Sequence, residues 1–135
     1  MVDGNTAGRE HIDLDIIPPN ILNRFAALAH KDNAKWWTNL FTGEPVERNK
    51  GELIALMHSE LSEALEGVRK GLQDEKLPHR KAEEVELVDA LIRIFDYAGA
   101  YGLDLDGAFW EKRAYNLKRA DHKVENRVKE GGKKF

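Results

Sequence analysis

Apolar residues recur three and four positions apart along most of the chain, and this helical period most constrains what the chain can fold into. Asn20, Asn49 and Asp104 are expected to cap helix N-termini, and Gly71 is expected to end the second helix. The periodic runs lie at about 20–37, 49–71 and 104–119, with a further run that starts between 79 and 82 and ends at about 101. No stretch alternates as a strand does. The sequence therefore predicts an all-α fold, an antiparallel bundle of about four to five helices.

The length of 135 residues and the apolar content of 41% predict one domain. We expect an N-terminal arm at 1–19, a helical core at 20–119 and a basic C-terminal tail at 120–135. The chain has no cysteine, which excludes disulfides, thiolate metal sites and a cysteine nucleophile. The first thirty residues contain no apolar run long enough for a signal peptide or a membrane span. We expect a cytoplasmic protein without a membrane partner.

Charge is distributed unevenly, although the net charge is only −3. Residues 51–110 contain thirteen acidic and six basic residues, whereas residues 111–135 contain four acidic and nine basic residues. A basic tail suits nucleic acid, but beside an acidic cluster it equally suits a phosphate ester carried with metal ions. Nucleic acid is the less favoured partner.

One glutamate of the second helix, Glu60, lies on the side of the helix that is expected to be buried. At about 100° per residue, Glu60 lies inside the apolar arc, Glu63 lies on the border of the arc and Glu66 points away from it. A buried carboxylate requires compensation by Arg or Lys, by a hydrogen-bonding shell or by a metal ion. The apolar arc comprises Leu53, Ile54, Leu56, Met57, Leu61, Ala64, Leu65 and Val68.

Polar side chains also form a stripe along the third helix, where Glu86, Asp89, Arg93 and Asp96 lie opposite the expected packed face. That face comprises Val85, Leu87, Val88, Leu91, Ile92, Ile94, Phe95 and Ala98. The stripe taken alone is typical of a solvated surface. Two acid pairs on adjacent helices, ExxE and then ExxD after twenty-two residues, would instead surround a shared volume. Their mutual repulsion favours hard cations with oxygen ligands, Mg²⁺ or Mn²⁺.

Histidine-based metal sites fit the sequence poorly. None of the five histidines follows a glutamate by three residues, so the Glu-x-x-His signature of di-iron bundles is absent. The histidines are too scattered for a zinc hydrolase. His58, two residues before Glu60, is interpreted as a packed or surface residue.

The fourth helix places Lys112, Asn116 and Arg119 on one stripe. This stripe is either an ordinary solvated helix end or a set of donors for phosphate oxygens that metal ions leave uncovered. Trp36 and Trp37 are either packing residues or a stacking surface for a nucleobase.

Together these segments resemble the MazG-like, all-α nucleoside triphosphate pyrophosphohydrolases over about residues 49–123. The signature of that family is ExxE, ExxD and then Lys-x-x-x-Asn-x-x-Arg, found here at 60–63, 86–89 and 112–119. The resemblance implies Mg²⁺ bound by Glu60, Glu63, Glu86 and Asp89. It also implies substrate contacts from Lys112, Asn116, Arg119 and Asp96, and we add Trp37 as a candidate.

By the same resemblance, the expected reaction splits an NTP or dNTP into a monophosphate and pyrophosphate. Glu60 and Glu63 are the expected catalytic residues, Glu63 as a ligand and a candidate base. A homodimer or homotetramer is expected, in which a partner subunit helps to form the site. The N-terminal region matches the family less clearly, so base preference stays open. Two alternatives remain: a related reaction on a nucleotide such as phosphoribosyl-ATP, and an inactive helical oligomer that serves as an interaction module.

Overall fold

The computed structural model describes residues 11–119 and 124–133. Its helices are α1 (Ile21–Asp32), the 3₁₀ helix η2 (Ala34–Trp37), α2 (Lys50–Lys70), α3 (Ala82–Tyr101), α4 (Leu105–Lys118) and α5 (Val124–Arg127). Within these residues the only β-type pairings are two isolated bridges, so the predicted all-α class is confirmed. None of the described helices is both long and apolar enough to cross a lipid bilayer.

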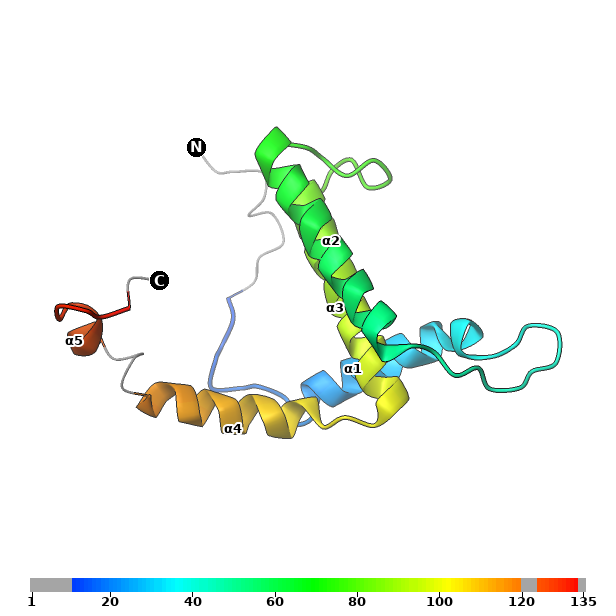
Figure 1. The fold of residues 1–135 in the computed structure, drawn as a ribbon, viewed down its shortest axis with the longest axis horizontal. Helices are drawn as coiled ribbons and strands as arrows, with labels where there is room; N and C mark the ends of the chain where they lie inside the picture. Colours follow the sequence, from blue (N-terminus) through cyan, green and yellow to red (C-terminus); the bar gives the residue numbers. More distant parts are fainter. Residues whose placement is uncertain (1–10, 120–123, 134–135) are drawn as a thin grey trace.

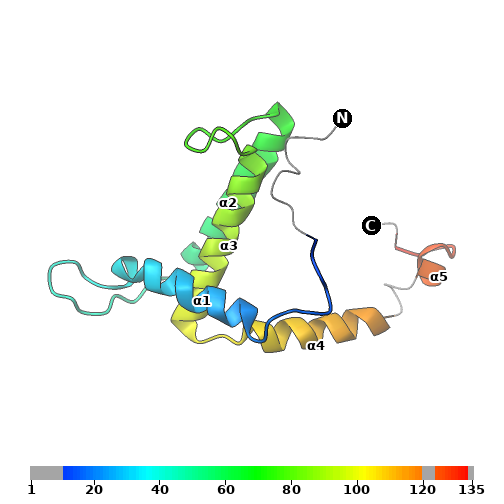
Figure 2. The same ribbon diagram turned by 180° about the vertical axis from the view of Figure 1, so that it is seen from behind.

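Helices α2 and α3 run antiparallel and side by side, and α1 packs across α3 near its C-terminal end (Figure 1). The view from behind shows the same arrangement, with α4 running away from the α2–α3 pair (Figure 2). The antiparallel packing expected of a bundle is thus present in the α2–α3 pair, while α4 contacts α1. Part of the expected arm, 1–10, and parts of the expected tail, 120–123 and 134–135, lie outside the described residues.

Small residues let the three packed helices approach closely. A Cβ added at Gly67 of α2 would lie 2.9 Å from the Cβ of Ala82 on α3. A Cβ added at Gly99 of α3 would lie 2.5 Å from the carbonyl oxygen of Ala26 on α1. The buried apolar residues are mainly alanines, and Leu53 is the large exception. The core therefore depends on close backbone approach more than on large apolar side chains.

Three of the four predicted helix boundaries are confirmed by their hydrogen bonds and dihedral angles. Asn49 Oδ1 accepts the backbone N–H of Glu52 at 3.0 Å, and Asp104 Oδ1 accepts that of Gly107 at 2.9 Å. Gly71 ends α2 with φ of 61°, the left-handed conformation that glycine adopts without strain.

Asn20 occupies the N-cap position of α1 as predicted, but its side chain makes no capping hydrogen bond. Asp106 of α4 caps α1 instead, accepting the backbone N–H groups of Leu22 at 3.3 Å and Asn23 at 2.7 Å. In return, Asn23 Oδ1 accepts the N–H of Leu105 at 2.9 Å. The two helix N-termini cap each other across the chain, a contact between distant residues that a local pattern does not reveal.

Most of the side chains that were predicted to form the packed face of the third helix are exposed in the single chain, so this prediction is largely wrong. Val88 and Leu91 are 50% and 46% exposed, whereas Asp96 on the opposite stripe is only 9% exposed. On α3, Leu87, Ile92 and Ile94 are exposed as well, as are Ile54, Leu56, Leu61, Leu65 and Val68 of the α2 arc. The physical reason is that α3 turns its small residues and its polar stripe toward α2, α1 and η2, which leaves large apolar side chains outside.

Candidate functional site

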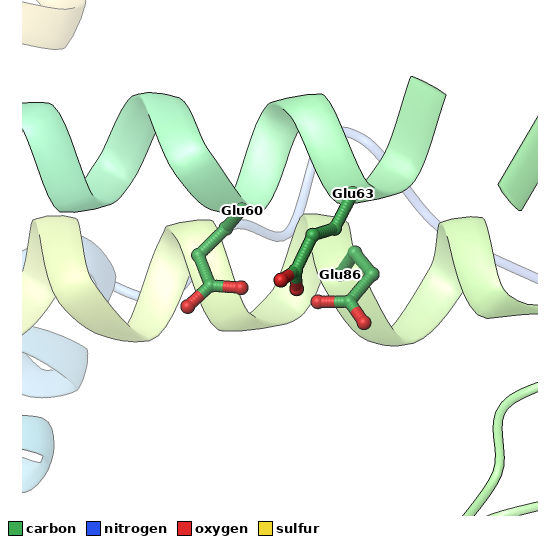
Figure 3. A group of neighbouring side chains, drawn as sticks. All are labelled: Glu60, Glu63 and Glu86. Carbon is green, nitrogen blue, oxygen red and sulfur yellow. The ribbon is translucent and has the colours of Figure 1, made fainter. Parts of the chain in front are cut away.

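The antiparallel α2–α3 pair brings three carboxylates together, Glu60 and Glu63 from α2 and Glu86 from α3 (Figure 3). Each offers one oxygen, and these three oxygens lie within 4.8 Å of one another. We call these three residues the acid cluster. The ExxE pair and the first acid of ExxD thus face each other across two helices.

Asp89, the fourth expected ligand, is not one of these three residues but lies next to them. It lines the same surface hollow as Glu60. Burial and the negative charge of Glu60 raise the pKa of Asp89, while Arg93 opposes that shift. Asp89 therefore belongs to the electrostatic surroundings of the acid cluster.

The angular argument about α2 correctly predicts that Glu60 is buried, but it places Glu63 and Glu66 in the wrong order of exposure. Glu60 is only 9% exposed, Glu63 is exposed and Glu66 is half-buried. Glu66 points elsewhere and forms an ion pair with Lys70, with 45% of its side chain exposed. The helical period predicts the burial of Glu60, which depends mainly on its direction around one helix.

Arg93 compensates the buried charge of Glu60. Its Nε lies 2.7 Å from Glu60 Oε1, an ion pair between α3 and α2. Arginine was one of the three compensations that the sequence left open, and the ion pair identifies it as Arg93.

Glu86 shows the strongest electrostatic perturbation of the acid cluster. Burial raises its pKa from 4.5 to about 7, aided by hydrogen bonding to Glu63 and Glu60 and by the charges of Glu63 and Asp89. Near neutral pH this carboxyl group holds a proton part of the time. A cation placed among the three carboxylates would favour release of that proton.

Beside the acid cluster lies a polar hollow of about 540 Å³, within the range of small-molecule sites. It is lined by Asn33, Trp36, Arg48, Glu60, Asp89, Ile92, Arg93 and Asp96, and we call it the polar hollow. Trp36 is 57% exposed at this surface. No sequence pattern singled out Arg48 or Asn33, because both lie outside the regular helices; the charge of Arg48 was the only available signal.

Trp37 and Asp96, both expected to contact substrate, bind each other. Trp37 Nε1 donates to Asp96 Oδ1 at 3.0 Å and to Oδ2 at 3.1 Å, and His30 Nδ1 lies 2.9 Å from the same Oδ1. The Trp37 ring also meets the edge of Tyr101, with centroids 5.6 Å apart. These contacts favour the packing interpretation of Trp37.

The expected phosphate-binding stripe lies on α4 and, with Arg119, just after its last residue, and α4 diverges from the α2–α3 pair (Figure 1). Lys112 and Asn116 line an apolar groove of about 910 Å³ between α1, α3 and α4. Lys112 Nζ and Arg119 Cζ lie 4.8 and 5.8 Å from the Tyr115 ring centroid. A single chain therefore does not bring this stripe to the acid cluster.

Comparisons of the chain with protein-family models, with curated proteins and with solved structures find no match. Its function has to be inferred from the residues and their geometry.

Proposed function

We propose that this protein is a divalent-metal-dependent pyrophosphohydrolase that cleaves an NTP or dNTP to the monophosphate and pyrophosphate. The observation that carries the proposal is the convergence of Glu60, Glu63 and Glu86 from two helices. The raised pKa of Glu86 supports it, because burial and the neighbouring carboxylates Glu63 and Glu60 together disfavour the charged form of Glu86, as is common at functional sites. The order and spacing of ExxE, ExxD and the basic stripe resemble those of the NTP pyrophosphohydrolases. From this resemblance we take nucleoside triphosphates as the substrate class.

The residues present fit Mg²⁺ or Mn²⁺. All the donors are carboxylate oxygens, which these hard ions prefer. The three cluster oxygens already lie within 4.8 Å of one another. Glu60, Glu63 and Glu86 would hold the ion, with Asp89 beside them.

When bound, the ion would neutralise phosphate charge and lower the pKa of water. In the proposed reaction, a water oxygen bonds to the α-phosphorus while the bond from that phosphorus to the α,β-bridging oxygen breaks. Pyrophosphate leaves with that oxygen, and the proton lost by water passes to Glu63, the exposed member of the cluster. Glu60, buried between the helices, fixes the position of the ligand set.

We further propose that the active form is a homodimer or homotetramer. The stripe of Lys112, Asn116 and Arg119 could then reach the acid cluster of another copy. One support is that α4 runs away from the α2–α3 pair of its own chain (Figure 1). A second support is that large apolar side chains of α3 are exposed, and a second chain would cover them.

The test is release of pyrophosphate across the common NTPs, the common dNTPs and phosphoribosyl-ATP, with and without Mg²⁺. We expect pyrophosphate, not orthophosphate, and only with the metal. The panel also separates the two substrate alternatives. Absence of release from every nucleotide in the panel would contradict the proposal.

The Arg93–Glu60 ion pair favours a second candidate function, an inactive helical interaction module, because it compensates Glu60 without metal. That candidate predicts no thermal stabilisation by Mg²⁺ or Mn²⁺. The enzyme proposal predicts a rise of Tm with ion concentration, since an ion that binds only the folded protein stabilises it. Thermal unfolding with each ion separates the two.

A further inference from the structure

Two arginines from distant parts of the sequence line the polar hollow. Arg48 lies in the loop before α2, and Arg93 lies on α3 one turn after Asp89. The hollow and the acid cluster share Glu60, so a molecule filling the hollow would lie directly beside the three carboxylates. Positive side chains at this place are suited to an anion held next to metal-binding acids.

Arg48 is positioned by stacking instead of by an acidic partner. Its Cζ lies 4.9 Å from the Trp37 ring centroid, and Asp96 holds that ring through the indole N–H. Among the described residues, no salt bridge involves Arg48. A guanidinium stacked on an aromatic face keeps its edges available for hydrogen bonds. Arg48 is therefore a cation held beside the polar hollow with its donors uncommitted to a carboxylate.

Arg93 is committed to Glu60, but only through Nε in the 2.7 Å ion pair. A guanidinium carries four further N–H donors on its two terminal nitrogens. With 39% of the Arg93 side chain exposed and 12% of the Glu60 side chain exposed, the arginine is the more accessible partner. A divalent ion and Arg93 compete for the same carboxylate, so ion binding at Glu60 would release the guanidinium into the hollow.

We propose that Arg48 and Arg93 together bind a phosphate group of the substrate in the polar hollow, and that Arg93 leaves Glu60 to do so when a divalent ion binds. The inference rests on the proposed function and deepens it by naming the anion-binding residues of the same site. The ion would neutralise Glu60 and Asp89, two of the three acids that line the polar hollow, while the third, Asp96, already accepts the indole N–H of Trp37. Ion and phosphate therefore strengthen each other's binding, each by the same factor.

The test uses the full chain and inorganic pyrophosphate as the probe, titrated by calorimetry with and without Mg²⁺. Wild type is expected to bind pyrophosphate only with Mg²⁺. Arg48→Gln and Arg93→Gln should each weaken that binding about 10- to 100-fold, the effect of losing a charge-assisted hydrogen bond. Arg48→Lys and Arg93→Lys should recover part of it.

Arg80→Gln is the matched control, since Arg80 forms an exposed pair with Glu84. It should bind pyrophosphate as wild type does. Mg²⁺ titrated alone should bind Arg93→Gln at least as tightly as wild type, because Glu60 has lost its competitor. Weaker Mg²⁺ binding to a folded Arg93→Gln would overturn the exchange of partners.

The nucleotide assay separates this inference from the proposed function. If wild type releases pyrophosphate from a nucleotide and both Gln variants keep its KM, the inference is wrong and the function stands. If wild type releases none, yet Mg²⁺-dependent binding of pyrophosphate requires Arg48 and Arg93, the function is wrong and the anion site stands. Thermal unfolding establishes that each variant is folded, and the Lys variants provide the test if a Gln variant is not.

Discussion

At the scale of single residues, the acid cluster is held together against its own repulsion. Arg93 forms an ion pair with Glu60. Burial and the neighbouring carboxylates raise the pKa of Glu86 to about 7. A carboxyl group whose pKa is raised in the folded protein binds protons more tightly there than in the unfolded chain. Its contribution to stability is complete below pH 4.5, its ordinary pKa, and is lost as pH rises through about 7.

We predict that in EDTA the Tm of wild type falls, relative to Glu86→Gln, as pH rises from about 5 to about 8. The Gln variant lacks this titration and provides the baseline. Over the same range, the Tm gain from Mg²⁺ should grow in wild type, because protons stop competing for the ligand. Differential scanning calorimetry at several pH values measures both, and parallel curves for the two proteins would contradict the assignment.

Trp37 provides a second test at this scale, because its indole N–H donates to the buried carboxylate of Asp96. We predict that Trp37→Phe lowers the free energy of unfolding by about 1.5 to 3 kcal/mol, the value of a hydrogen bond to a charged group. Trp36→Phe, at an exposed position, should change it by less than about 0.5 kcal/mol. Urea unfolding measures the two variants side by side, and equal losses would reject the packing role of Trp37.

At the scale of helices, local chemistry made several boundaries predictable. The caps at Asn49 and Asp104 and the terminal Gly71 act within a few residues of themselves, so a short stretch of sequence reveals them. The cap of α1 comes from Asp106, more than eighty positions away, and only the fold brings it there.

We predict that Asp106→Ala lowers the free energy of unfolding by about 1 to 2 kcal/mol, as loss of a helix cap does. The loss should also loosen α4, because Asp106 and Asn23 join it to α1. Glu111→Ala, on an exposed position of α4, is the matched control, with an expected change within about 0.5 kcal/mol. Hydrogen exchange of the α4 amides reports the loosening, and unchanged protection in Asp106→Ala would show that the α1–α4 contact is unimportant.

At the scale of the whole molecule, large apolar side chains lie outside while acids line the α2–α3 pair. Periodicity identified the two faces of α3, but it assigned the packed one wrongly, because an apolar face need not be buried by its own chain. The same limit applies to the site. Glu60, Glu63 and Glu86 were predictable from spacing on neighbouring helices, whereas Arg48 required the loop conformation before α2.

The proposed oligomer can be tested by introducing one charged side chain on the exposed apolar face of α3. We predict that Leu91→Glu dissociates the assembly and abolishes pyrophosphate release while the monomer stays folded, since Leu91 is already 46% exposed in one chain. Leu40→Glu introduces the same charge in a loop at a position that is 72% exposed and should change neither property. Sedimentation equilibrium gives the mass, and a wild type that sediments as a monomer would contradict the assembly.

The most direct test of the central claim, that the acid cluster holds catalytic metal, compares pyrophosphate release by wild type, Glu60→Gln and Glu66→Gln with Mg²⁺. Both substitutions replace a glutamate of α2, but only Glu60 belongs to the cluster, whereas Glu66 pairs with Lys70 on the surface. We predict that Glu60→Gln stays folded and loses release, and that Glu66→Gln keeps the rate of wild type. Equal rates in Glu60→Gln and wild type would contradict the metal site.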